Sequence, residues 1–182
     1  SPERTDGFDI FELFDHNIAY EIRLQQAMEE DLIVPFHYFG VTDISVDGEI
    51  LDENTDFNKL TEDERVDRII QISDKYGCDN NIIRGLVFCS RKEEAEELSQ
   101  KFNLKGHKSI ALTGRHSEKE REDAIQKLES NNLEEKLDFI FTVDIFNEGI
   151  DIPKINQIIM LRPTQSNIIF IQQLGRGLRR FE

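Results

Sequence analysis

The sequence predicts an α/β domain built on a parallel sheet, and two observations lead to that prediction. Over residues 81–182, four short apolar runs alternate with amphipathic stretches, which is the pattern of successive β–α units. The chain of 182 residues is long enough for one domain with a sizeable core, or for one domain with an appendage. We therefore expect a sheet with helices on both faces.

The four apolar runs are the predicted strands. Each is short and rich in residues that favour β-structure, as expected for buried parallel strands. They cover residues 85–90, 108–113, 137–143 and 157–161.

Two predicted helices follow the first two strands. Ser90 with Glu93, and Ser117 with Glu120, have the spacing of a capping box, in which the serine and the carboxylate each satisfy a free backbone N–H. Apolar residues then recur at helical spacing and should pack on the sheet. They are Ala95, Leu98 and Phe102 in the first helix, and Ala124, Ile125 and Leu128 in the second.

The first 80 residues predict a less regular arrangement. Residues 35–41 have the pattern of a strand, and Leu24, Ala27 and Met28 indicate a short helix before it. A polar, acidic loop with a turn at Asp47-Gly48 is expected over residues 42–59. A helix over residues 61–75 follows, with Thr61 and Glu64 at capping-box spacing and an apolar face formed by Val66, Ile69 and Ile70.

Charge is distributed unevenly along the chain. The formal net charge is -15, yet residues 1–80 hold 21 acidic against 6 basic residues, whereas residues 81–182 hold 16 of each. We interpret the acidic segment as a solvated surface in preference to a regulatory contact. The balanced second segment leaves room for a local basic face that could bind phosphates.

Composition argues against several classes of protein. No run of 18 apolar residues and no signal-peptide pattern is present, so we expect a cytoplasmic protein without a membrane partner. Cys78 and Cys89 cannot form a disulfide framework, and the four histidines lack metal-ligand spacing with them, so no metal site is expected.

The loop after the third predicted strand has polar residues around a glycine. Gly149 is flanked by Asn147, Glu148 and Asp151, at the carboxyl edge of the sheet where open α/β folds bind ligands. Such a loop can offer backbone N–H groups and a carboxylate to a ligand. A tight turn with solvated acids would have the same composition.

A second stretch of this kind covers residues 172–180. On a helix, Gln172, Arg176 and Arg179 share one stripe, and Ile171, Leu174 and Leu178 form another. Arginine suits phosphate because its planar fork donates two hydrogen bonds and stays charged. The alternative is a basic, solvent-exposed helix end.

These two stretches resemble motifs V and VI of superfamily 2 helicases in order and separation. Motif VI is similar to Gln172-x-x-Gly175-Arg176-x-x-Arg179, and motif V to Val143-Asp144 followed by Gly149 and Asp151. Residues 86–90 resemble motif IV, and Leu112-Thr113-Gly114 followed by Arg121 resembles the block that lines the nucleic-acid path. The resemblance covers residues 83–180 and implies a RecA-like fold.

The N-terminal region resembles the restriction-subunit-like branch of these DEAD/DEAH helicases. Residues 2–7 look like the end of the motif that closes the first RecA-like domain, and residues 17–21 and 32–35 look like the connector of that branch. The implied organisation is a connector over 1–34 and a helicase C-terminal RecA-like domain over 35–182, with an acidic loop and helix inserted at 42–80. Gln172, Gln173 and Leu178 depart from the DEAD-box pattern of His, Arg and Gly, which disfavours a strict DEAD-box RNA helicase.

The resemblance assigns roles to eleven residues. Arg176 and Arg179 would act as catalytic arginine fingers, and Gln172, Gly175, Gly149 and Asp151 would line the nucleotide. Nucleic-acid backbone would be contacted by Ser90, Thr113, Gly114, Arg121 and Thr142.

A glycine-rich phosphate loop and a strand-end Asp-Glu pair are missing from the sequence. ATP and Mg²⁺ would therefore be bound mainly by a preceding N-terminal RecA-like domain, and this chain alone should not hydrolyse ATP. Nucleic acid is the implied partner, with duplex DNA favoured over RNA. A non-catalytic binding module and an unrelated flavodoxin-like phosphate-binding domain are the alternatives.

Overall fold

The computed structural model describes residues 62–78, 81–143, 152 and 154–161, and also the backbone of residues 45–46 and 49–50. The predicted connector at 1–34 and the predicted strand at 35–41 lie outside these residues.

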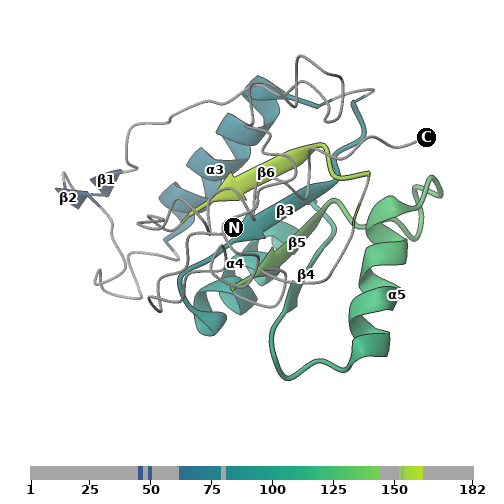
Figure 1. The fold of residues 1–182 in the computed structure, drawn as a ribbon. Helices are drawn as coiled ribbons and strands as arrows, with labels where there is room; N and C mark the ends of the chain where they lie inside the picture. Colours follow the sequence, from purple (N-terminus) through teal and green to yellow (C-terminus); the bar gives the residue numbers. More distant parts are fainter. Residues whose placement is uncertain are drawn as a thin grey trace, which may run out of the picture.

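Within the described residues, a parallel four-stranded sheet forms the centre of the fold (Figure 1). Its strands are β3 (Gly85–Phe88), β4 (Ser109–Leu112), β5 (Phe139–Thr142) and β6 (Gln157–Met160), in the order β4-β5-β3-β6. All four predicted strands are confirmed, and each is shorter than predicted because the ladder pairs four residues per strand. The α/β class expected from the alternating pattern is therefore confirmed.

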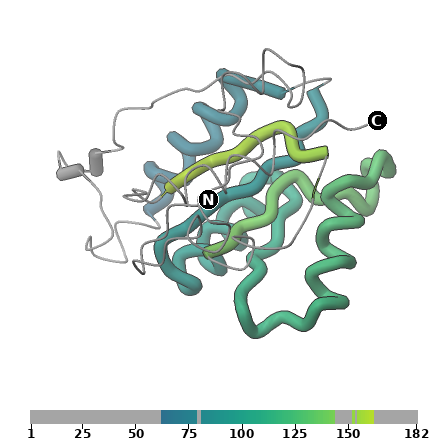
Figure 2. Tube along the Cα trace, viewed as in Figure 1, coloured from purple at the N-terminus to yellow at the C-terminus, as the bar shows by residue number. Residues whose placement is uncertain are grey.

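Among the described residues three helices cover the sheet, and they confirm the helices predicted over 61–75, after Ser90 and after Ser117. They are α3 (Asp63–Tyr76), α4 (Lys92–Leu104) and α5 (Glu118–Glu129). The helix predicted around Leu24, Ala27 and Met28 lies outside the described residues. The strand order requires α4 to carry the chain from β3 past β5 to β4, and α5 to bring it back to β5 (Figure 2). Right-handed crossovers in opposite directions place their helices on opposite faces of a sheet.

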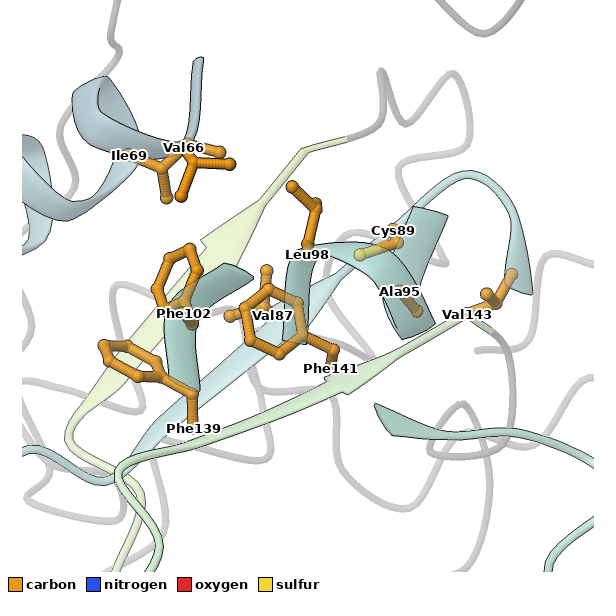
Figure 3. Close-up of a cluster of buried hydrophobic side chains, with 10 residues drawn as sticks. All are labelled: Val66, Ile69, Val87, Cys89, Ala95, Leu98, Phe102, Phe139, Phe141 and Val143. Atoms are coloured by element: carbon orange, nitrogen blue, oxygen red, sulfur yellow. The ribbon is translucent and has the colours of Figure 1, made fainter. Parts of the chain in front are cut away.

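One face of the sheet is covered by α3 and α4. Phe139 and Phe141 on β5 contact Phe102 on α4 edge to face, with ring centroids 5.3 and 4.9 Å from that of Phe102. Val66 and Ile69 bring α3 into the same buried cluster (Figure 3). The predicted apolar faces of both helices are therefore confirmed, and α3 shares the core of the sheet.

The opposite face packs against α5. Leu86 and Phe88 alternate with Val87 along β3, so they contribute to a second cluster that includes Ala124 and Leu128 of α5. Removing each large apolar side chain from water contributes about 1.5–3 kcal/mol to stability. Burial on both faces explains why the strands are continuous apolar runs.

The two helices that follow strands begin in different ways. The Ser117–Glu120 capping box at α5 is present as predicted. The predicted Ser90–Glu93 box is wrong: the N-cap of α4 is Arg91, and the carboxylate that reaches back is that of Glu94. The physical reason is a tertiary partner, because an arginine of α3 holds Glu94 in the interior.

The other predicted helix start falls two residues too early. Helix α3 begins at Asp63 after Glu62, which makes no side-chain cap hydrogen bond. Thr61 lies outside the described residues.

A short hairpin lies within the segment predicted to be an irregular loop. β1 (Ser45–Val46) pairs antiparallel with β2 (Glu49–Ile50), and Val46 lies opposite Glu49. The turn predicted at Asp47-Gly48 lies outside the described residues. The prediction of a polar, acidic loop over 42–59 is wrong at the four residues of β1 and β2, which form strands.

The search for membrane spans covered the described residues and found no helix with the length and hydropathy to cross a bilayer.

The close packing of β3 against β5 predicts that Gly85→Ala is destabilising. A Cβ at Gly85 would overlap the ring of Phe139, which is fully buried against Phe102 and His107 and cannot move aside. We expect the free energy of unfolding to fall by about 1–3 kcal/mol, measured by urea denaturation. Gly114→Ala is the matched control, since no described atom lies within 4 Å of a Cβ built there. Equal stabilities for the two variants would contradict this packing.

The capping box of α5 predicts a pH dependence. The Ser117 backbone N–H and then its hydroxyl donate to Glu120, at 2.7 and 2.8 Å, and lower the pKa of that carboxyl. Because the pKa is lower in the folded state, the stabilisation is present above the ordinary glutamate pKa and is lost as the pH falls through the folded value.

Ser117→Ala removes the hydroxyl donor but keeps the backbone donor. The pKa of Glu120 should therefore rise part of the way toward its ordinary value in an NMR titration, and loss of the N-cap should cost about 1 kcal/mol of stability. Ser130→Ala, at the other end of the same helix, is the control. An unchanged Glu120 pKa in Ser117→Ala would refute the capping-box account.

Candidate nucleic-acid interface

Three strands end together at the carboxyl edge of the sheet. Thr142, the last residue of β5, is in register with Phe88 on β3 and Leu112 on β4. The Cys89 N–H donates to the Thr142 carbonyl at 2.7 Å and extends the β3–β5 pairing by one step. The residues that follow these strand ends are therefore neighbours, and they include Ser90, Thr113 and Gly114.

The loop after β3 presents Ser90, which is half-buried. Its backbone N–H donates to Glu94 Oε2 at 2.8 Å, and the other carboxylate oxygen, Oε1, accepts from Arg65 NH1 at 2.8 Å. The N–H of Ser90 is thus occupied inside the protein. The hydroxyl is the group that Ser90 can offer to a ligand.

A turn after β4 holds Thr113 and presents Gly114. The Thr113 N–H donates to His116 Nδ1 at 3.1 Å, and the His116 N–H donates to the Thr113 carbonyl at 3.1 Å. Thr113 Oγ1 accepts from the Arg115 N–H at 3.4 Å. Thr113 is buried by this turn, whereas Gly114 is exposed. The turn therefore exposes the backbone of Gly114, and the Thr113 hydroxyl serves the turn itself.

Thr142 ends β5, the strand that lies between β4 and β3 in the sheet. Its side chain is fully buried, and within the described part of the chain its hydroxyl has no hydrogen-bond partner. Alternation along β5 places it on the same face as Ile140, toward α5. The hydroxyl therefore faces the interior in this structure.

Arg121 follows the turn on α5 and is half-buried. Its Nε atom is buried and has no hydrogen-bond partner among the described residues. A buried guanidinium nitrogen without a partner costs free energy, and this nitrogen can reach a ligand only if the residues around it move.

The nucleotide-facing candidates lie outside the described residues. These are Gly149, Asp151, Gln172, Gly175, Arg176 and Arg179. Among the residues that are described, no group of three or more histidine, cysteine or acidic side chains could hold a metal ion.

Sequence reasoning missed three residues that shape this edge, namely Arg65, Glu94 and His116. Each acts through hydrogen bonds to a loop or to a partner on another element, and motif spacing carries no signal for such contacts. The one available signal was the position of Glu94 in the first turn of α4, where a carboxylate can reach back to a free N–H.

A family model described as the helicase conserved C-terminal domain matches residues 63–180. Among relatives, a 51.5 kDa protein of a Lactococcus phage is 21% identical over 181 residues, which are 98% of this chain and 39% of the relative. A Saccharomyces cerevisiae protein assigned as ATP-dependent helicase IRC3 is 34% identical over 94 residues, which are 52% of this chain and 13% of that protein. The chain thus spans well under half of each relative.

Among solved structures, a fragment assigned as the HsdR subunit of a type I restriction enzyme from Vibrio vulnificus has a similar fold. Its TM-score is 0.73 at 19% identity, and the likeness covers 98% of this chain and 35% of that one. This likeness confirms the RecA-like fold. Because the family match covers most of its length, the chain belongs to the helicase conserved C-terminal domain family.

Proposed function

We propose that this chain is the C-terminal RecA-like half of an ATP-dependent helicase or translocase that moves along nucleic acid. The observation that supports this proposal most is the family match over residues 63–180, which contains both the predicted loop at 144–151 and the arginine-bearing stretch at 172–179. The name of the yeast relative, an ATP-dependent helicase, agrees with it.

In this proposal the ATP site is shared with a preceding RecA-like domain, which supplies the phosphate loop and Mg²⁺. Arg176 and Arg179 meet the phosphates, Gln172 and Gly175 position them, and Gly149 with Asp151 lines the nucleotide. The guanidinium fork stabilises the charge that develops on the transferred phosphoryl group. This chain alone should accordingly show no ATP hydrolysis.

In this proposal the carboxyl edge of the sheet binds the nucleic-acid backbone. Ser90 and Gly114 are the accessible positions there, and a hydroxyl or a backbone N–H can hold a phosphate without reading the base. Arg121 lies in the first turns of α5, and we propose that its buried Nε becomes available to a phosphate when the domain closes on ATP. Thr113 and Thr142 are buried, so in this proposal they contribute to the shape of the edge until closure on ATP rearranges it.

Phosphate contacts predict binding that weakens with salt. The 182-residue chain should bind an oligonucleotide weakly at low salt, and the logarithm of its affinity should fall linearly with the logarithm of the salt concentration. Gly114→Ala should raise the Kd about threefold or more, a loss of at least about 0.7 kcal/mol, because a methyl group stands where a phosphate approaches the backbone. Fluorescence anisotropy with DNA and RNA oligonucleotides in parallel also tests the proposed preference for duplex DNA.

Two outcomes of this experiment would count against the proposed interface. One is binding that does not respond to salt. The other is a Gly114→Ala variant that binds as tightly as the parent chain.

Arginine-finger chemistry predicts a large effect on turnover. In the protein that joins this chain to its ATP-binding domain, Arg179→Lys should lower the nucleic-acid-stimulated kcat by about 10³-fold or more. Lysine keeps the charge but lacks the planar fork. ATP affinity and Tm should change little.

Arg180→Lys is the matched control, being the same substitution one residue later, outside the motif. It should leave kcat near the parent value. If Arg176→Lys and Arg179→Lys both retain parent turnover, neither arginine is catalytic, and the proposed role of this domain in ATP hydrolysis fails.

A further inference from the structure

The loop that presents Ser90 is fixed by a buried ion pair between two helices. Glu94 in the first turn of α4 accepts the Ser90 N–H through Oε2 and the guanidinium of Arg65 through Oε1, both at 2.8 Å. The side chains of Arg65 and Glu94 are 4% and 0% exposed. One carboxylate therefore connects helix α3, helix α4 and the end of β3.

Burial means that Glu94 must keep both of its hydrogen-bond donors. A carboxylate removed from water must keep its partners, because loss of one leaves an uncompensated buried group. Each oxygen of Glu94 has one donor from a different element, so the backbone of Ser90 is fixed relative to α3. A buried pair of this kind is weak evidence for stability, since well-packed apolar residues often serve as well.

We propose that Glu94, held by Arg65, is a positioning residue that sets the Ser90 loop for contact with the nucleic-acid backbone. This inference rests on the proposed function. Because Glu94 accepts the Ser90 N–H, the hydroxyl is the group that Ser90 offers to a phosphate. Because Arg65 holds Glu94, the position of this hydroxyl depends on the packing of α3 against α4. Helix α3 thereby contributes to nucleic-acid binding through Arg65.

Glu94→Gln is the sharpest test because it conserves shape. The side-chain amide has one oxygen, so either Arg65 or the Ser90 N–H must face its NH₂ group and lose an acceptor. If Glu94 acts through Ser90, Glu94→Gln should raise the Kd of the 182-residue chain for a mixed-sequence DNA oligonucleotide by about tenfold, which is about 1.4 kcal/mol. In a Ser90→Ala background, Glu94→Gln should cause almost no further rise in the Kd.

A double-mutant cycle separates positioning from general destabilisation. A purely structural role for Glu94 predicts that the losses of the two single variants multiply, and that result would overturn the proposal. Parent affinity in Glu94→Gln would overturn it equally. If Glu94→Gln does not fold, the double variant Arg65→Met, Glu94→Leu replaces the ion pair because it removes both charges together. This variant should have the Tm of the parent chain and the same tenfold rise in Kd.

Asp63→Asn is the matched control. Asp63 on α3 binds Lys101 on α4 at 3.0 Å and so joins the same two helices, but on the exposed surface. Affinity for the oligonucleotide should stay at the parent value in this variant. A tenfold loss in Asp63→Asn would show that any contact between α3 and α4 matters, and would contradict the specific role of Glu94.

Hydrogen exchange at the Ser90 amide distinguishes failure of this inference from failure of the proposed function. Loss of the Glu94 acceptor in the Arg65→Met, Glu94→Leu variant should accelerate exchange of that amide about tenfold or more, while core amides of β3 stay protected. If the parent chain binds no oligonucleotide, the proposed function fails, and the exchange rate alone decides whether Glu94 fixes the loop. An unchanged exchange rate would refute the positioning role.

Discussion

Parallel pairing of β3, β4 and β5 is the constraint on which the site depends. Because Thr142 is in register with both Phe88 and Leu112, the residues that directly follow these three strand ends lie at one edge. Segments more than fifty residues apart in the chain become neighbours there. The fully buried apolar side chains on both faces hold this register, since a slip of one residue would exchange the two faces of a strand.

Helix α3 belongs to this assembly although it precedes the β–α units in the chain. Val66 and Ile69 supply apolar contacts to the face covered by α4, and Arg65 supplies the guanidinium for Glu94. The family match begins at residue 63, the first residue of this helix. The apolar contacts hold α3 in place, and the ion pair transmits its position to the loop of Ser90.

Apolar periodicity and capping-box spacing in the sequence were enough to predict most of the described fold. Contacts between residues far apart in the sequence could not be predicted from them. The strands were predictable because burial on both faces leaves continuous apolar runs, and Ser117 with Glu120 formed its box because both groups lie on one helix turn. The box at Ser90 failed because Arg65, 29 residues before Glu94, decides where that carboxylate points. The burial of Thr142 could not be predicted either, because it also depends on contacts between segments far apart in the sequence. The roles of Arg176 and Arg179 remain predictions.

The central claim is that nucleic acid meets the carboxyl edge of the sheet, and amide chemical-shift mapping tests it most directly. When an oligonucleotide is titrated into the isotope-labelled chain at low salt, the largest shifts should fall on Ser90, Gly114 and Arg115. Amides at the opposite edge, such as those of Arg84 and Asp138, should not move. Shifts concentrated at that opposite edge, or along the outer face of α4, would contradict the account.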